Sequence, residues 1–362
     1  MNWTRRQFSG MLAMGAASGL APGLSAQQPG RSLRYCIVGL GRISMQHFMP
    51  ATRLSKYGRV TALVSGHRDK AEKMAAEYGV PSKSIYSYQD YDAIARNPEI
   101  DAVYIALPNS MHAEYTIRAA KAGKHVLCEK PMATSAADAQ AMIDACRAAR
   151  RKLMIAYRCQ FEPINLRAVG LIRSGKLGKV EAISSGFGFN IGAGEWRLNR
   201  KLAGGGPLMD VGIYSLNACR YLTGEEPVGV QAYSSVIDRD GRFNEVEENL
   251  SWSMKFPSGA VASCNTTYGA NMTGFFRVFG SRGVIHVENA FGYDGQHLTA
   301  AVEGEAPINE ASTERDPAQF PRLADHLAEC VFDNKEPKCA GEEGLRDMKL
   351  MAAIYRTCAT AG

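Results

Sequence analysis

Short apolar runs alternate with amphipathic stretches in the part of the chain that follows residue 30. Each run has the length of a parallel strand buried on both faces, and helical patterns separate the runs. The runs are Arg34–Leu40, Val60–Val64, Ile100–Leu107, His125–Cys128 and Lys152–Tyr157. This order predicts an α/β domain with a parallel sheet over residues 31–156.

The pattern changes after Tyr157 to runs in which apolar and polar positions alternate. These runs are rich in Val, Thr, Ser and aromatic residues, and turn signals such as Pro257-Ser258-Gly259 separate them. They are Val180–Phe189, Val228–Val236, Leu250–Phe256, Val261–Tyr268, Gly274–Gly280 and Gly283–Glu288. Helical patterns return over residues 320–358. We expect a second domain over residues 157–362, an open and mostly antiparallel sheet with one helical face, and a homodimer formed through the open face.

The first 26 residues have the pattern of an export signal. Thr4-Arg5-Arg6-Gln7-Phe8 is a twin-arginine sequence, a mildly apolar stretch follows from Met11 to Leu24, and Ser25-Ala26 supplies small residues for cleavage. The apolar stretch is too short for a membrane span. We expect export by the Tat machinery to the periplasm; the alternative is a frayed amphipathic N-terminus.

Composition excludes several classes of function. The net charge of +6 is spread along the chain, which argues against nucleic-acid binding. The nine cysteines form no CxxC pair, and the histidines lack metal-ligand spacing, so we expect no metal. The odd number of cysteines argues against a full disulfide framework and favours buried, inert thiols.

A dinucleotide fingerprint lies at the end of the first apolar run. Gly39-Leu40-Gly41-Arg42-Ile43-Ser44 has the form G-x-G-x-x-S, with Ser44 at the usual place of the third glycine. The two glycines permit a tight turn and a close approach of backbone to pyrophosphate, and the N-terminus of the following helix favours phosphate. We therefore expect residues 39–43 to contact a nicotinamide dinucleotide.

The end of the second run predicts which dinucleotide binds. An NAD enzyme usually has Asp or Glu here to bond the ribose 2′-hydroxyl, but this chain has Ser65-Gly66-His67-Arg68-Asp69-Lys70. A hydroxyl, a small residue and basic side chains accept a 2′-phosphate that a carboxylate would repel. Ser65, Gly66, His67 and Lys70 therefore predict NADP, the alternative being a polar surface loop.

Further candidates follow the later strands, where ligands bind in such sheets. Leu107, Asn109 and His112 follow one strand, and Glu129 and Lys130 follow the next. On the predicted helix after Gly204-Gly205-Gly206-Pro207, Asp210 and Tyr214 are four residues apart and share a face. An isolated pair of this kind is more readily a cap aspartate and a core tyrosine.

Three motifs together resemble the glucose–fructose oxidoreductase family of the Gfo/Idh/MocA superfamily. They are Leu107-Pro108-Asn109, Glu129-Lys130-Pro131 and Asp210-x-x-x-Tyr214, and the resemblance extends over residues 34–358. It implies a Rossmann domain, a sheet domain, a sugar substrate, and Lys130 beside the nicotinamide with Asp210 and Tyr214 completing the site. The short segment between the expected cleavage site and the first strand fits the aldose–aldose oxidoreductase subgroup better than glucose–fructose oxidoreductase itself.

Oxidation of an aldose at C1 requires a base for the hydroxyl proton, while the cofactor takes the hydride. Tyr214 is our first candidate for the base, and we expect the ammonium of Lys130 to favour its phenolate form. Lys130 remains an alternative proton carrier, and Asp210 is expected to orient the sugar or Tyr214. Because no periplasmic pool of free NADP is expected, we predict a ping-pong cycle in which bound NADP(H) is recycled and a second sugar becomes an alditol.

Aromatic and Arg side chains suit sugar faces and the ribose and phosphates of a cofactor, although each would equally serve domain packing. The candidates for cofactor contact are Tyr88, Arg158, Trp196, Arg197 and Tyr293. Those for substrate contact, besides Lys130, Asp210 and Tyr214, are Tyr157, Arg197 and Tyr268.

Two other functions fit the same fold. One is an exported glycosidase that oxidises its substrate transiently with a bound nicotinamide, against which Ser65 speaks because such enzymes resemble NAD binders with an acid there. The other is a catalytically silent sugar-sensing protein, against which the intact set of Lys130, Asp210 and Tyr214 speaks.

Overall fold

The computed structural model describes residues 30–313 and 319–359, so the twin-arginine segment lies outside the described residues. From Ser32 onwards the chain forms one compact unit. Among the described helices, none combines the length and the apolar character needed to cross a bilayer.

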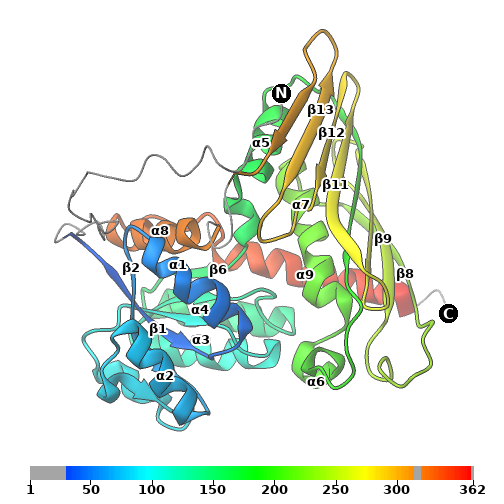
Figure 1. Cartoon of the computed structure of the whole chain (residues 1–362). Coiled ribbons are helices and arrows are strands. Elements are labelled where there is room, and N and C mark those ends of the chain that lie inside the picture. Colours follow the sequence, from blue (N-terminus) through cyan, green and yellow to red (C-terminus); the bar gives the residue numbers. More distant parts are fainter. Residues whose placement is uncertain (1–29, 314–318, 360–362) are drawn as a thin grey trace, which may run out of the picture. The chain divides into compact units, whose positions relative to one another are not determined.

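A parallel sheet with the strand order β3-β2-β1-β4-β5-β6 forms the first half of this unit (Figure 1). The central strands are buried along nearly their whole length, which explains their unbroken apolar runs. The strands are β1 (Leu33–Val38), β2 (Gly58–Val64), β3 (Ile85–Tyr86), β4 (Ala102–Ile105), β5 (His125–Cys128) and β6 (Leu153–Ile155). The helices between them are α1 (Met49–Leu54), α2 (Arg68–Tyr78), α3 (His112–Lys121) and α4 (Ala136–Ala148). The predicted Rossmann fold is therefore confirmed.

The fingerprint turn leaves no room for side chains at its first glycine. Gly39 has a φ of +93°, and a Cβ there would lie 2.5 Å from the carbonyl oxygen of Ala106. Ser44 donates a hydrogen bond of 2.6 Å from its hydroxyl to the Gly39 carbonyl oxygen, so the serine that replaces the third glycine ties the turn together. Ser44–Phe48 then form a π-helical turn that continues into α1.

The second half of the unit is an eight-stranded sheet in the order β14-β13-β12-β11-β7-β10-β9-β8. Only β7 and β10 pair in parallel, which confirms the mostly antiparallel sheet. The strands are β7 (Val180–Gly188), β8 (Gly229–Ser235), β9 (Asn249–Lys255), β10 (Val261–Thr267), β11 (Met272–Gly280), β12 (Gly283–Glu288), β13 (His297–Val302) and β14 (Ile308–Ala311).

Helices cover one face of this sheet. The helix α7 packs on β7, β10 and β11, α5 packs on β12 and β13, and α9 packs on β8. From Leu250 onward, the residues of β9 alternate between buried and exposed, as a strand with one covered face requires. The helices of this half are α5 (Pro163–Arg173), α6 (Arg200–Ala203), α7 (Ile213–Thr223), α8 (Gln319–Phe332) and α9 (Gly341–Ala359).

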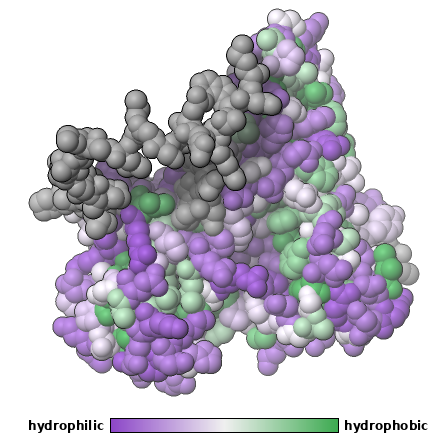
Figure 2. Space-filling view, in the orientation of Figure 1, coloured by the Kyte–Doolittle hydropathy of each residue, from purple (hydrophilic) through white to green (hydrophobic). Residues whose placement is uncertain are grey.

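The two sheets belong to one packed unit because helices from the second half return to the first. α9 contacts α4 and β6 as well as α7 and β8, and α8 packs on α1 and β2 (Figure 1). The buried apolar side chains therefore form one core that continues from the Rossmann sheet to the antiparallel sheet. On the outside, the face shown in Figure 2 is largely hydrophilic, with its apolar side chains in small scattered patches.

Candidate active site

A cavity of about 820 Å³ lies where the carboxyl ends of the parallel strands meet the second sheet. The glycine turn after β1 and the loops after β2, β4 and β5 form one side. The end of β7, the segment before α6, the turn before α7 and the loop after β12 form the other. The cavity thus gathers segments that are far apart in the sequence.

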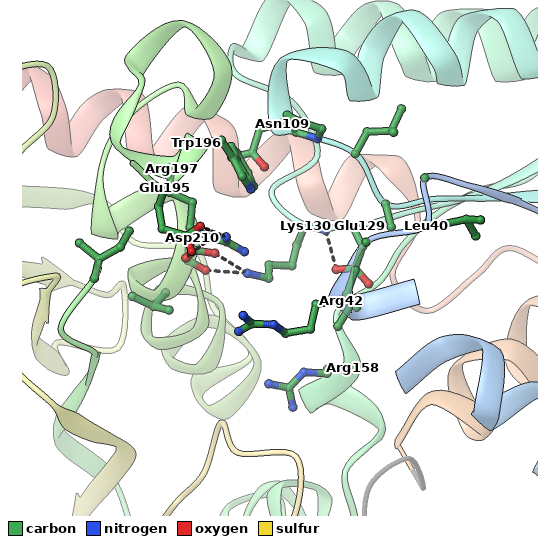
Figure 3. Close-up of a pocket in the computed structure, with 18 of the residues that line it drawn as sticks. Leu40, Arg42, Asn109, Glu129, Lys130, Arg158, Glu195, Trp196, Arg197 and Asp210 are labelled. Atoms are coloured by element: carbon green, nitrogen blue, oxygen red, sulfur yellow. Dashed lines mark hydrogen bonds and ion pairs between the residues drawn. The ribbon is translucent and has the colours of Figure 1, made fainter. Parts of the chain in front are cut away.

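Most of the residues singled out in the sequence line this cavity. They are Gly39, Leu40, Gly41, Arg42, Ile43, Ser65, Gly66, His67, Lys70, Tyr88, Leu107, Asn109, Glu129, Lys130, Arg158, Trp196, Arg197, Asp210, Tyr214 and Tyr293. In Figure 3, Arg42, Lys130 and Arg158 approach the same space, and Trp196 faces Asn109.

Three expected site residues lie outside the lining. His112 is buried behind it, with one ring nitrogen 2.8 Å from the Pro131 carbonyl oxygen and the other 2.9 Å from that of Leu107. It therefore braces the two loops rather than facing the cavity. Tyr157 is buried, and Tyr268 is buried with its hydroxyl 3.0 Å from Asp210 Oδ2. In the structure, neither Tyr157 nor Tyr268 is among the side chains on the cavity wall.

Lys130 and Asp210 form the centre of the site (Figure 3). Lys130 Nζ donates to the backbone oxygen of Asp210 at 2.6 Å and lies 3.4 Å from Oδ1. The other carboxylate oxygen, Oδ2, accepts hydrogen bonds from Arg197 Nε at 2.9 Å and from the Tyr268 hydroxyl at 3.0 Å. A backbone contact and a side-chain contact thus fix the position of the ammonium.

The charges of these neighbours keep Asp210 ionised. Burial alone would raise the pKa of Asp210, but the charges of Arg197 and Lys130 outweigh burial and hold the pKa below its ordinary value. Asp210 therefore enters any reaction near neutral pH as a carboxylate that orients Lys130 and Arg197.

Tyr214 follows a π-helical turn, Leu208–Gly212, instead of the regular helix that its spacing from Asp210 predicted. Its ring stacks on Phe291 at 5.6 Å between centroids, and Lys130 Nζ lies 4.6 Å from the ring centroid. Burial raises the pKa of Tyr214 above its ordinary value, and the charge of Arg158 lowers it by less. The expected lowering of the Tyr214 pKa by the nearby ammonium is therefore not the net result, because burial outweighs the positive charges around the ring.

The loop after β2 has no acidic side chain at the strand end. The Ser65 hydroxyl accepts a hydrogen bond of 3.1 Å from the backbone N–H of His67, which shapes the turn that carries His67 and Lys70 toward the cavity. A Cβ at Gly41 would meet no described atom within 4 Å, although the neighbouring Gly39 is tightly packed. The open space beside Gly41, the basic side chains and the helix start fit a dinucleotide.

Sequence reasoning missed the wall on the side of the second sheet. Phe187, Phe189 and Ile191 line the cavity from the end of β7, with Glu195, Val211 and Phe291 beside them. The alternation of large apolar residues at 187, 189 and 191 was a usable signal, since alternate positions of a strand share one face. The neighbours of Glu195 in the sequence did not predict its place in the site, because that place depends on how its loop folds over Asp210 and Arg197.

The site has no cluster of metal ligands: among the described residues, no three His, Cys, Asp or Glu side chains come together in that way. The arrangement instead places a cation, a carboxylate and a phenol at one end of the cavity and a phosphate-binding turn at the other. This combination suits proton and hydride transfer at a hydroxylated carbon, with a dinucleotide supplying the redox chemistry.

Comparison with known proteins agrees with this geometry. The family described as "Oxidoreductase family, NAD-binding Rossmann fold" matches residues 33–157, and the "GFO/IDH/MocA C-terminal domain" matches residues 166–286. The NADP-dependent D-xylose 1-dehydrogenase of Haloarcula marismortui is 31% identical over 338 residues, which cover 91% of each chain. A second such enzyme, from Haloferax volcanii, is 32% identical over 333 residues, 91% of this chain and 98% of that one.

A solved structure is more similar still. The aldose–aldose oxidoreductase of Caulobacter crescentus, complexed with glycerol, has a TM-score of 0.88 and 45% identity, covering 92% of this chain and 99% of that one. The resemblance seen in the motifs is therefore confirmed. With both domain families matched in chain order, this chain belongs to the Gfo/Idh/MocA family of oxidoreductases.

Proposed function

We propose that this protein is a periplasmic, NADP-dependent sugar oxidoreductase that oxidises an aldose at C1 to the lactone. The hydride then reduces a second sugar to an alditol, and the cofactor stays bound throughout. The observation that carries this proposal is the convergence of Lys130, Asp210 and Tyr214 on the cavity that also contains the dinucleotide turn. The names of the similar xylose and aldose enzymes support a sugar as substrate.

NADP rather than NAD is favoured by the loop after β2. Ser65 stands where a carboxylate would repel the 2′-phosphate, and His67 and Lys70 line the same part of the cavity. The NADP specificity of the two similar D-xylose dehydrogenases supports this choice.

The residues of the chain divide the work of the reaction. When bound at the glycine turn, NADP(H) would supply the acceptor and the donor of the hydride exchanged between the two sugars. Lys130, fixed by Asp210, holds a sugar hydroxyl near the reacting carbon, and Phe187 and Trp196 offer apolar surface to the faces of the sugar ring.

Tyr214 Oη carries the proton. In its phenol form it donates to the carbonyl oxygen of the acceptor, and the phenolate left behind takes the hydroxyl proton of the next donor. Burial raises the pKa of Tyr214, which favours the phenol that the reduction step requires; before the first oxidation, that phenol must lose its proton to solvent. The proton, like the cofactor, is thus retained from one half-reaction to the next.

Export and oligomeric state are part of the same proposal. The twin-arginine sequence at residues 4–8 and the small residues at 25–26 support export of the folded protein with its cofactor bound. The exposed face of the antiparallel sheet, where Tyr233 and Val261 are accessible, supports a homodimer through that face. Fractionation of cells expressing Arg5 and Arg6 both changed to Lys tests the export, and sedimentation of the purified protein tests the dimer.

The spectrum of purified, extensively dialysed protein tests the enzymatic proposal. Addition of an aldose, with no cofactor supplied, should produce the absorbance of reduced nicotinamide, and addition of a second sugar should remove it. The variant Tyr214→Phe should retain NADP but lose both changes. If neither aldoses nor added NADP produce the band, while an aryl glycoside is cleaved, the glycosidase alternative is correct.

A further inference from the structure

Arg158, at the start of the turn Arg158–Phe161 that follows β6, is a buried cation whose hydrogen-bond partners are all neutral. Its side chain is 4% exposed. Its guanidinium donates hydrogen bonds to the backbone oxygens of Phe291 at 2.6 Å and Gly292 at 2.8 Å, and to Gln319 Oε1 at 2.7 Å. Removing a guanidinium from water is costly, and none of its hydrogen-bond partners is a carboxylate; the buried Glu129 interacts with its charge without a hydrogen bond. A neutral side chain of similar size would fill this position at a lower desolvation cost, so the presence of the Arg158 charge requires an explanation.

The hydrogen bonds of Arg158 fix one turn, Ala290–Asp294, between β12 and β13. Gln319 Nε2 adds bonds to the backbone oxygens of Gly292 at 3.1 Å and Tyr293 at 3.0 Å. The ring of Tyr293 stacks on His47 with 4.0 Å between centroids and 18° between planes. His47 lies on the helical turn that begins at the dinucleotide fingerprint. The turn from the second sheet therefore closes onto the cofactor-binding segment of the first, and Gly292 and Tyr293 line the cavity there.

The same cation lies against the proton carrier. The guanidinium carbon of Arg158 is 4.3 Å from the ring centroid of Tyr293 and 5.1 Å from that of Tyr214. Both contacts are within the range of a cation–π interaction. Arg158 thus contacts both the closing turn and Tyr214 through its charge, and through its hydrogen bonds it also holds the backbone of that turn.

We propose that Arg158 is a positioning residue that joins cofactor retention to proton transfer: it holds the Ala290–Asp294 turn closed over the dinucleotide and supplies the positive charge that stabilises the phenolate of Tyr214. This inference rests on the proposed function. It adds that the position of the turn over the cofactor and the ionisation of Tyr214 both depend on one guanidinium. Loss of this guanidinium would therefore weaken the hold of the turn on the cofactor and the stabilisation of the phenolate together.

The two roles have separable consequences. The charge of Arg158 opposes the effect of burial on the pKa of Tyr214, whereas Cys159 and Glu129 raise that pKa and Lys130 lies 4.6 Å from the ring centroid. Loss of the Arg158 charge therefore raises the pKa further. The fraction of phenolate at a given pH below the pKa then falls about tenfold for each unit by which the pKa rises. The hydrogen bonds to Phe291 and Gly292, in contrast, require the planar fork of arginine, which a lysine ammonium does not reproduce.

Three variants and one control test the proposal. Arg158→Gln removes charge and fork, Arg158→Lys keeps the charge alone, and Tyr293→Leu removes the stack on His47 while leaving Arg158 intact. Arg167→Gln is the matched control, since Arg167 on α5 is half exposed and pairs with Glu310 away from the cavity. Each protein is loaded with NADP, and two quantities are measured: the rate at which NADP is released on dilution, and the pH dependence of single-turnover aldose oxidation.

The proposal expects a distinct pattern for each variant. Arg158→Lys and Tyr293→Leu release NADP at least about tenfold faster than the wild type but keep its pH profile, because the charge beside Tyr214 remains. Arg158→Gln releases NADP faster and also moves the rising limb of the pH profile upward by about one unit or more. Titration of tyrosine absorbance in the cofactor-free proteins, with Tyr214→Phe as reference, should show the same upward shift.

The results separate this inference from the proposed function. If the wild type oxidises no aldose, the proposed function fails, whereas the release rates and the tyrosine titration still decide the inference. If the wild type is active but the pH profile and release rate of Arg158→Gln match those of Arg167→Gln, the inference alone is overturned. Should Arg158→Gln not fold, wild-type release rates in both Arg158→Lys and Tyr293→Leu would overturn it equally.

Discussion

Replacement of Asp210 by Asn isolates the role of the central carboxylate, because the side chain keeps its size and loses its charge. Oδ2 accepts hydrogen bonds from Arg197 and Tyr268, and Lys130 lies 3.4 Å from Oδ1. If the amide oxygen of Asn replaces Oδ2, the amide nitrogen must face the ammonium of Lys130, which is a donor facing a donor. The bond from Lys130 to the backbone oxygen at 2.6 Å survives, so Lys130 loses its counter-charge but keeps one anchor.

The contacts give the size of the effect. A hydrogen bond to a charged acceptor contributes about 1 kcal/mol more than one to a neutral acceptor, so the two bonds to Oδ2 account for about 2 kcal/mol. The Lys130–Asp210 attraction is about 5 kcal/mol at an effective dielectric constant of about 20, but desolvation offsets most of it and about 1 kcal/mol remains. If this loss of about 3 kcal/mol appears in the transition state, aldose oxidation slows roughly 100-fold.

Single-turnover oxidation of an aldose by NADP-loaded protein measures this rate directly. NADP affinity should change by less than about threefold, because the fingerprint at Gly39–Gly41 does not contact Asp210. Asp92→Asn is the matched control, since Asp92 is exposed and pairs with Arg118 outside the cavity. The pKa of Asp210 is held low in the fold, so its stabilising charge is present above the ordinary pKa and lost on acidification. An Asp210→Asn enzyme that oxidises the aldose within threefold of the wild type would refute this account of the carboxylate.

Three further predictions follow from particular contacts. Ser65→Asp should weaken NADP binding by about 10- to 1,000-fold and improve NAD binding, because a carboxylate repels the 2′-phosphate; calorimetric titration with both cofactors checks this, and an unchanged preference would place the 2′-phosphate elsewhere. Gly39→Ala should destabilise the cofactor-free protein by about 2 kcal/mol or more, since its Cβ would lie 2.5 Å from the Ala106 oxygen, whereas Gly41→Ala should leave that stability nearly unchanged and weaken NADP binding; equal denaturant midpoints for the two would contradict this. Burial raises the pKa of Asp347 to about 6, so the folded form binds its proton more tightly than the unfolded form, and the contribution of Asp347 to the unfolding free energy falls as the pH rises from its ordinary value to about 6. Asp347→Asn should remove that slope from urea unfolding curves, and an unaltered slope would assign it to another group.

The parts of the site that follow a local rule were predictable from the sequence. The glycine turn, Ser65 and Lys130 all lie at carboxyl ends of parallel strands, and such ends share one edge of a sheet whatever the details of packing. The open antiparallel sheet followed from alternation along strands such as β9. These predictions depend on periodicity and turn chemistry, which are properties of short segments.

The parts that depend on packing between distant segments were not predictable in the same way. His112 follows a strand as Asn109 does, but its ring is taken up by two backbone oxygens behind the loop. The pKa of Tyr214 is affected by burial more than by the cations next to it, and no spacing rule reports this balance. The central position of Arg158 likewise becomes visible only when the loop after β12 and the start of α8 come together around its guanidinium.

The central claim is that the protein transfers hydride between two sugars through NADP that does not leave. The most direct test is to incubate dialysed protein with an aldose, adding no cofactor, and to quantify lactone and alditol over time. The account predicts equal amounts of the two products, each exceeding the amount of protein many times. Lactone that stops at one equivalent per protein, or that forms without alditol once NADP is added, would contradict retention and recycling of the cofactor.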